Sequence, residues 1–429
     1  MKSKDRSRLI EWGKTLLIIL LALSAIYLLS MAHIFDGAQA GFLGLIASRP
    51  TTSEDPAPVR SSSAAVYPVR LAIYQDGQRY GVQYDQATVD TTYTELATLF
   101  SEAFSSAAQP RQIRASSWRA ALCRTGIYVD YLHAVPLDIL SGLSGEGEHN
   151  PVLTGSARRV CLAEDETGGV SLFYINESDG SYYASQTTLS LATHLETAVS
   201  DISPNGALFA FEVADMETLD PYTLLTSTPQ ANVYTAGNPL SSDSARVSEL
   251  LNALTFHGQN ATLDPVLGGQ YVEGSDFLRL SSHGVVTFHT VGDTAFRFSL
   301  PDPSVQGALG YVSALANATV GVWCGQARLQ LSGMEQTQDG LVITFQYCLN
   351  GSSVALPEEH AARFVVQNGA VTDFSLYLRT YTNTEETSPL LPVLQAAAAM
   401  EALNTDGKEL VLLYQDSGSE TVSAYWAAN

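Results

Sequence analysis

The chain has 429 residues, of which 45% are hydrophobic and 15% charged, and its formal net charge is −22. That hydrophobic fraction is normal for packed domains, and the length suffices for two or three of them, which excludes a largely disordered protein. From residue 61 onward, 39 acidic residues outnumber 14 Arg and one Lys; because such a surface repels phosphate backbones, nucleic acid is excluded as a partner.

The N-terminus has the features of a membrane anchor. Residues 15–35 carry no formal charge and are mostly Leu, Ile and Ala, and a helix rising about 1.5 Å per residue would there span the roughly 30 Å hydrocarbon core. Basic residues concentrate in residues 1–14, so the positive-inside rule predicts a cytoplasmic tail and an extracytoplasmic remainder. The triplet Ala38-Gln39-Ala40 has the form of a signal-peptide cleavage site. A cleaved signal peptide is therefore the alternative to a retained single-pass anchor in the cell membrane.

A linker and a first domain follow the span. Residues 36–65 contain a stretch of Pro, Ser and Thr with few large apolar side chains, which predicts a flexible linker. Residues 66–240 predict an N-terminal α+β ectodomain with an antiparallel sheet. Its expected elements are a hairpin over 67–85 turning at Asp76-Gly77, a helix over 93–107, a strand and short helix over 126–143 that meet at Pro136, and strands over 157–165, 170–176 and 181–189.

The rest of the chain predicts a C-terminal α+β module over 241–385 and a closing helix-hairpin module over 386–429. The expected elements are a helix over 243–257, a hairpin over 277–290 turning at His283-Gly284, a helix over 301–321, strands over 327–334, 341–348, 362–367 and 371–379, a helix over 388–403 and a hairpin over 409–428. Helix followed by antiparallel strands thus occurs twice, which favours two related small modules. The predicted fold class is α+β: a single N-terminal transmembrane helix, then an extracytoplasmic multi-domain region of antiparallel sheets with packed helices.

All four cysteines lie in the part predicted to be exported, where disulfides are permitted. Their order suggests the pairs Cys123–Cys161 and Cys324–Cys348, and the hairpin over 327–350 would return Cys348 toward Cys324. Their spacing matches no zinc knuckle. Buried free thiols are the alternative for both pairs.

The sequence contains none of the common catalytic or nucleotide-binding motifs that we sought. His283 and His289 lie on opposite sides of a predicted turn with no Cys or carboxylate to complete a zinc site. Adjacent carboxylates such as those at 164–166 are usually solvated in turns. We therefore predict no catalytic residue, metal ligand or cofactor. An exported hydrolase that acts with carboxylates across a cleft stays open as an alternative.

The order of the segments resembles one family. A basic tail, a span and a Pro/Ser linker precede "LFSEAF" and "GIYVDYLHAVPLDIL" within 99–140, then "FYINESDGSYYASQ" over 173–186. This order is similar to that of the YycH-type regulators and the related YycI proteins, which accompany the WalK–WalR cell-wall two-component system of low-GC Gram-positive bacteria. The resemblance implies a non-enzymatic, membrane-anchored accessory protein that modulates a sensor histidine kinase, with a second single-span regulator as a further partner. The acidity and Ala-rich composition of this chain depart from the family.

If the resemblance holds, the span also contacts the kinase. Small and hydroxyl side chains let helices approach one another in lipid, and the span offers Ala22, Ser24, Ala25, Tyr27 and Ser30. The alternative for these residues is that they face lipid. The alternative for the whole protein is a membrane-tethered module that binds a cell-wall polymer or peptide.

Overall fold

The computed structural model describes residues 66–143, 150–214, 216–241, 244–257, 261–264, 268–292, 297–402 and 407–429. The predicted tail 1–14, span 15–35 and linker 36–65 lie outside these residues. Within the described part, no helix combines the length and the apolar character needed to cross a membrane. The architecture is α+β, with antiparallel sheets and packed helices, as the sequence predicts.

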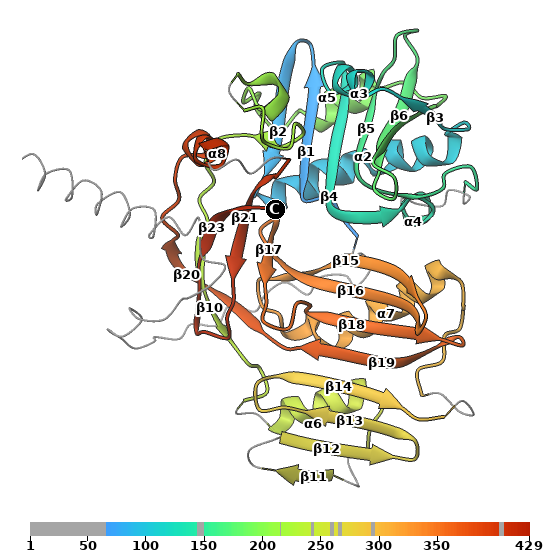
Figure 1. The fold of residues 1–429 in the computed structure, drawn as a ribbon, viewed down its shortest axis with the longest axis vertical. Helices are drawn as coiled ribbons and strands as arrows, with labels where there is room; N and C mark the ends of the chain where they lie inside the picture. Colours follow the sequence, from blue (N-terminus) through green and yellow to red (C-terminus); the bar gives the residue numbers. More distant parts are fainter. Residues whose placement is uncertain are drawn as a thin grey trace, which may run out of the picture.

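The first half of the chain forms a seven-stranded antiparallel sheet (Figure 1, top) with the order β2-β1-β4-β5-β6-β7-β3. Asp76 and Gly77 both have positive φ, which closes the predicted first hairpin with a tight turn. The predicted strand over 126–143 does pass into a helix after Pro136. The strands are β1 (Arg70–Gln75), β2 (Gln78–Gln83), β3 (Arg111–Ile113), β4 (Gly126–Pro136), β5 (Ser156–Glu164), β6 (Val170–Asn176) and β7 (Ser181–Gln186).

Both faces of this first sheet are covered. Helices α2 (Gln86–Ser106), α4 (Leu137–Leu143) and α5 (Ala192–Ala198) pack on one face, in the same apolar cluster as Leu71 and Leu172. Helix α3 (Ala115–Ala121), β8 (Leu208–Phe209), η1 (Ala210–Glu212) and β9 (Leu224–Leu225) cover the other, with Ala72 and Phe173. Because successive strand residues point to opposite faces, the central strands are buried almost without a break.

Helix α2 begins seven residues before the predicted start at residue 93. The Asp85 carboxylate accepts a hydrogen bond from the Thr88 backbone N–H at 3.2 Å and so caps the helix. The first two turns are mostly polar or β-branched, so they lack the apolar spacing from which the prediction was made.

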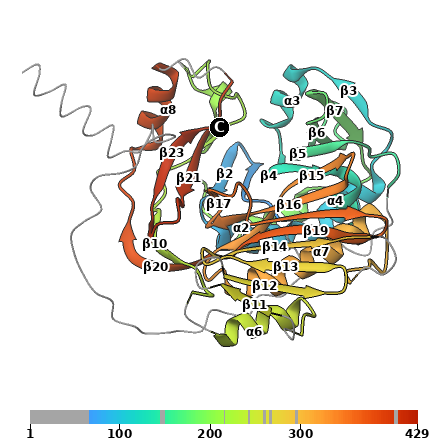
Figure 2. The same cartoon turned by 60° about the horizontal axis from the view of Figure 1, so that its bottom comes forward.

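The second half of the chain forms an eleven-stranded sheet with the order β11-β12-β13-β14-β19-β18-β16-β17-β21-β23, and β15 pairs with β16. Helices α6 (Ser244–Ala253) and α7 (Val305–Thr319) pack on one face (Figures 1 and 2), and the turn η2 (Gly321–Trp323) follows α7. The strands are β11 (Ala261–Asp264), β12 (Gly268–Glu273), β13 (Asp276–Leu280), β14 (Val285–Thr290), β15 (Arg328–Thr337), β16 (Gly340–Leu349), β17 (Ser352–Ala355), β18 (Ala362–Gln367), β19 (Ala370–Tyr377), β21 (Leu410–Gln415) and β23 (Ala424–Ala428).

The last part of the chain belongs to two sheets at once. Strand β21 pairs parallel with β17 and antiparallel with β23, whereas β22 (Thr421–Val422) pairs with β10 (Asn232–Gly237). A third strand, β20 (Thr380–Thr387), completes the small sheet β20-β10-β22, and α8 (Val393–Ala402) lies between β20 and β21 in the chain. The predicted closing module at 386–429 therefore has its helix and hairpin, and its strands also extend sheets built from earlier residues.

Candidate functional site

A buried ionic cluster joins the two halves of the molecule; we call it the ionic joint. Glu409, directly before β21, lies among Arg70 of β1 and Arg158 and Arg159 of β5. Its carboxylate accepts hydrogen bonds from the Nη2 atoms of Arg158 at 2.6 Å and Arg159 at 3.2 Å, and from Nη1 of Arg70. Asp130 of β4 accepts two hydrogen bonds from Arg158, both at 2.8 Å. Every one of these contacts to Glu409 links strands that are distant in the sequence.

The charges of the ionic joint balance. Asp220 accepts hydrogen bonds from Arg159 at 2.9 and 3.0 Å and supplies the third carboxylate for three guanidinium groups. The Asp130 and Glu409 side chains are 1% and 3% exposed. Burial alone would raise the pKa of Glu409, but Arg70, Arg158 and Arg159 outweigh burial and hold it at about 2. The same arginines lower the pKa of Asp130, so Asp130 and Glu409 are ionised at neutral pH.

Neutral contacts surround the ionic joint. The Tyr84 ring packs edge-on against Trp426 of β23 with centroids 5.9 Å apart, and its hydroxyl accepts a hydrogen bond from the Leu412 backbone N–H. The Asn350 side-chain amide donates to the Tyr84 carbonyl at 2.6 Å and accepts from the Gln86 backbone N–H at 2.9 Å. The two halves are therefore held together by charge, aromatic packing and backbone-directed hydrogen bonds.

The large sheet has one face that the helices leave uncovered; we call it the open face. Residues of β13 and β14 alternate between buried and exposed, which is the pattern of an antiparallel sheet with one solvent-exposed face. On this face Phe277 is 38% exposed and lies beside His289, whose Nδ1 is 2.5 Å from the Asp373 carboxylate. Arg279 and Arg363 occupy the neighbouring row of the same face. Among the described residues, neither arginine has an ion-pair partner.

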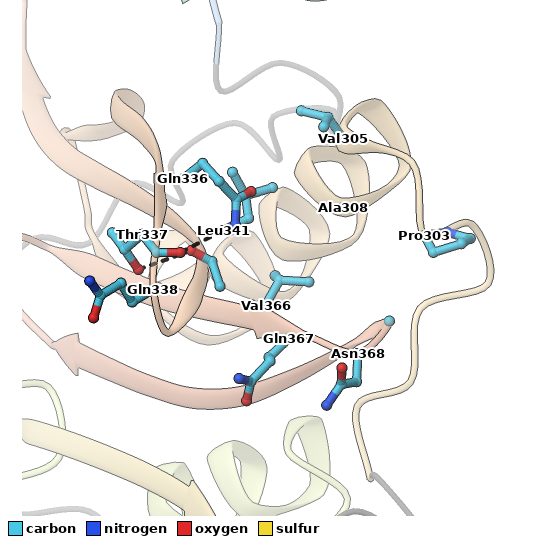
Figure 3. A pocket seen from close by; sticks show the side chains of 12 residues that line it. Pro303, Val305, Ala308, Gln336, Thr337, Gln338, Leu341, Val366, Gln367 and Asn368 are labelled. Carbon is cyan, nitrogen blue, oxygen red and sulfur yellow. Dashed lines mark hydrogen bonds between the residues drawn. The ribbon is translucent and has the colours of Figure 1, made fainter.

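A pocket of about 330 Å³ lies at the opposite side of the same sheet, at its hairpin tips (Figure 3). We call it the hairpin-tip pocket. Gln336, Leu341 and Val366 form one cross-strand row of β15, β16 and β18, and Val305 and Ala308 in the first turns of α7 face that row. The rim consists of the turns that join β15 to β16 and β18 to β19. The pocket is thus the end of the sheet that α7 does not fill.

One glycine shapes this pocket. Gly340 has a φ of +123° at the start of β16, and a Cβ there would lie 2.3 Å from the Val366 carbonyl oxygen. A side chain at this position would push β16 away from β18, so only glycine allows the close pairing that forms the pocket floor.

The predicted partner-contact residues Ala22, Ser24, Ala25, Tyr27 and Ser30 lie outside the described residues. They stay predictions, as do the cytoplasmic and extracytoplasmic assignments.

The predicted disulfides are not formed. Cys123, Cys161, Cys324 and Cys348 are free thiols in the structure. The hairpin that suggested the second pair is present, but its register places Cys348 opposite Arg328. The Cys324 thiol instead donates to the carbonyl oxygens of Gly321 and Ala327, at 3.0 and 2.9 Å.

Both predicted pairs contain a thiol that is buried and protonated. Burial raises the pKa of the Cys348 thiol to about 12 and also raises the pKa of Cys161. Cys348 packs with Tyr67, Val69 and Leu132, where the two halves meet. The structure therefore has buried thiols at Cys161, Cys324 and Cys348, whereas Cys123 is only partly buried.

The two histidines of the predicted hairpin lie apart, His289 on β14 and His283 in the turn before it. His283 and His289 are separated by the turn between β13 and β14, as predicted. Across the described ranges, no group of three or more His, Cys, Asp or Glu side chains is arranged to hold a metal ion.

The sequence analysis missed the ionic joint, although one signal was present. Arg158 and Arg159 stand side by side in an otherwise apolar predicted strand. Because two arginines in a buried strand require buried partners, their position predicts a carboxylate cluster. Nothing local identifies Glu409 as one of those partners, since it follows 250 residues later.

Comparison with known proteins gives one similarity of fold. Neither a protein-family model nor a curated protein matches the sequence. The crystal structure of YycH from Bacillus subtilis matches with a TM-score of 0.54 and 12% sequence identity, over 86% of this chain and 94% of YycH. The family resemblance proposed from segment order thus agrees with the three-dimensional structure, and the chain has a YycH-like fold.

Proposed function

We propose that this chain is a non-enzymatic accessory protein that modulates a sensor histidine kinase by protein–protein contact. The observation that carries the proposal is the YycH-like fold over 86% of the chain, since the YycH-type proteins that the segment order resembles are regulators. In this proposal residues 15–35 anchor the protein in the cell membrane. The described residues lie outside the cytoplasm, where they contact the sensor region of the kinase.

The open face is the surface that we assign to this contact. It offers Phe277 as an apolar centre and the unpaired guanidinium groups of Arg279 and Arg363 around it. Aromatic and arginine side chains are enriched among residues that dominate protein–protein binding energy. The adjoining row of this face carries Asp373 and Glu335, so a partner surface would meet charges of both signs there.

The ionic joint supports a mechanical role in the same proposal. A contact alters a kinase only when the regulator favours one kinase state over another, typically by about 1–3 kcal/mol. Because charged, aromatic and amide contacts hold the two halves together, a force applied at the open face would be transmitted through the body to its anchor.

The test separates the anchor from the open face. One variant replaces residues 15–35 with an unrelated apolar helix, and a second carries Phe277→Ala with Arg279→Ala. Both are compared with the unchanged protein at equal membrane levels, and the output of the partner response regulator is measured. We expect both to shift the output, the open-face variant by weakening the contact. Unchanged output in both variants would contradict the proposal.

A second candidate function is a membrane-tethered module that binds a polymer or peptide. The hairpin-tip pocket is the observation that favours it, because a volume of about 330 Å³ lies within the range of about 300–1,000 Å³ that is usual for ligand sites.

A further inference from the structure

The described chain begins between the two halves of the molecule. Residues 66–69 come directly after the predicted linker and directly before β1, and we call them the strap. Tyr67 is 6% exposed and Val69 is buried. Figure 1 shows this start of the chain between the first sheet and β15. Because the ends of a domain are poorly ordered unless they are tied down, a buried strap must be held by specific contacts.

The strap contacts both halves. On the side of the second half, the Arg328 guanidinium lies over the Tyr67 ring, 3.8 Å from its centroid, and the Tyr67 hydroxyl donates to the Leu329 carbonyl at 3.4 Å. On the side of the first half, the Val69 backbone N–H donates to the Asp130 carbonyl at 2.8 Å. Withdrawal of the strap would therefore remove contacts from both sides of the interface at once.

Side chains that hold the strap also join the two halves directly. The Gln330 side-chain amide of β15 donates to the Tyr67 carbonyl at 3.2 Å and to the Tyr131 carbonyl at 2.6 Å. Arg328, which covers the Tyr67 ring, also pairs with Asp90 of α2 at 2.5 Å. Because Gln330 and Arg328 each bind the strap and the first half together, loss of the strap would weaken the direct contacts as well.

The closed interface contains unfavourable features beside the strap. Leu132, which packs against Tyr67 and Val69, has a φ of +71°, a conformation that is costly for a residue with a side chain. The side-chain oxygens of Gln86 and Gln330 are buried and accept no hydrogen bond among the described residues, and water would reach them if the interface opened. Strain of this kind concentrates at segments that change conformation. The closed interface therefore depends on the contacts of the strap.

The chain directly after the strap is firmly held. Strand β1 pairs with β2 on one side and with β4 on the other. Its first residue, Arg70, is bound to Glu409 in the ionic joint and pairs with Asp130 at 3.6 Å. A pull on the linker would therefore load residues 66–69 first and stop at β1. The ionic joint would remain as the pivot between the two halves.

We propose that the strap couples tension in the membrane tether to the arrangement of the two halves. With the strap in place, the halves are locked together; when tension in the linker withdraws residues 66–69, the interface at β15 opens about the ionic joint. The inference rests on the proposed function in one respect, that residues 15–35 hold the tether in the membrane. The test supplies the force directly and involves neither a membrane nor the kinase.

The test is a force measurement on the full chain in detergent micelles with optical tweezers. One handle is attached through an azide-bearing amino acid at Ser61 in the linker and the other after Asn429, which exchanges two backbone hydrogen bonds with Glu409 beside the ionic joint. We expect a reversible step on the order of 10 Å, because four residues span at most about 14 Å. Unfolding of the first half would release on the order of hundreds of Å. Unfolding without an earlier reversible step would overturn the proposal.

Two variants and one matched control locate the step. Tyr67→Ala removes the ring and the hydroxyl contact of the strap. Arg328→Met removes the cation over that ring and its ion pair with α2; since the Arg328 side chain is 21% exposed, this variant serves if Tyr67→Ala does not fold. The control is Tyr183→Ala on β7, where the ring stacks on Tyr174 with centroids 5.4 Å apart and the hydroxyl donates to Asp179 at 3.1 Å.

The variants are compared at a constant force that populates both states of the unchanged protein. We expect the ratio of closed to open states to fall at least about tenfold in Tyr67→Ala and about fivefold in Arg328→Met, and to change less than about twofold in Tyr183→Ala. Equal ratios in all of these proteins would overturn the proposal. If the step is absent while the open-face variant still shifts the response-regulator output, this inference is wrong and the proposed function stands.

Discussion

The two large sheets of this protein differ in how many of their faces are buried. In the first sheet, β6 is buried at six consecutive residues from Val170 to Ile175, because helices lie on one side and α3, η1 and a short hairpin on the other. In the second sheet, β13 alternates strictly between buried and exposed residues. Both sheets are antiparallel at these strands, so topology does not cause the difference.

The difference in burial suggests different roles for the two sheets. A sheet buried on both faces has no face left for a partner, and its charged residues must be paired internally, as Arg158 and Arg159 are. A sheet with one wet face keeps exposed side chains such as Phe277 and Arg279 in a fixed row. Contact with other molecules is therefore expected on the second sheet, and stability is expected to depend more on the first.

The largest change in stability is expected from disrupting the ionic joint. Glu409→Gln removes one of three carboxylates and leaves the three guanidinium groups of Arg70, Arg158 and Arg159 with one positive charge unbalanced. Breaking a buried ion pair from one side typically costs about 3–5 kcal/mol, and we expect a loss of that size in urea unfolding followed by circular dichroism. The matched control is Glu420→Gln, an exposed position, with a change within about 0.5 kcal/mol. Similar stability of the two variants would show that the joint contributes little.

A matched pair of phenylalanines, one in each large sheet, tests whether burial of the sheet face determines the contribution to stability. Phe173 of the first sheet is 5% exposed and Phe277 of the second is 38% exposed. We expect Phe173→Ala to lower the free energy of unfolding by about 3 kcal/mol, since it leaves a cavity, and Phe277→Ala to lower it by less than about 1 kcal/mol. Equal losses measured by urea unfolding would mean that the open face is covered in solution.

The smallest expected effect concerns pH. His133 of β4 is half-buried, and its Nε2 has no hydrogen-bond partner among the described residues. Burial, reinforced by Arg158, lowers the pKa of His133 to about 4. The unfolded chain, with an ordinary histidine pKa of about 6.5, takes up this proton first.

The stability from the neutral His133 is therefore present above about pH 6.5 and is lost as the pH falls toward 4, by about 1–2 kcal/mol between pH 7 and pH 5. We expect His133→Gln to remove this part of the pH dependence, measured as the free energy of unfolding across that range. His289→Gln, on the open face, should leave it in place. An unchanged slope in His133→Gln would contradict the assignment.

Local signals predicted much of the fold. Asp76-Gly77 and His283-Gly284 each mark a turn that the structure contains. Strand β17 was missed although the turn at Asn350-Gly351, where both residues have positive φ, leads from β16 straight into it. It has only four residues, and its parallel partner β21 lies more than 50 residues away. The start of α2 was missed because a cap at Asp85, and no apolar periodicity, determines where it begins.

The sites were less predictable, for a physical reason. A buried charge at Arg158 can be suspected from its apolar neighbours, but its partners depend on how distant strands meet. The hairpin-tip pocket combines two turns of ordinary composition with the start of α7. Only the register of β15, β16 and β18 brings Gln336, Leu341 and Val366 into one row. Register of this kind depends on long-range pairing and on a bulge near Gly333.

The distance along the chain between the partners of the ionic joint has a consequence for biogenesis. Arg70 and Glu409 are 339 residues apart, so the first sheet is fully synthesised long before its balancing carboxylate exists. The last strand of that sheet ends at Gln186, 223 residues before Glu409 (409 − 186), so at about 5–20 residues per second the interval lasts roughly 11–45 seconds. Until then Asp130 and Asp220 supply two carboxylates for the three guanidinium groups of the joint, so one positive charge has no counter-charge. The ionic joint is therefore complete only when the last strands of the chain are present.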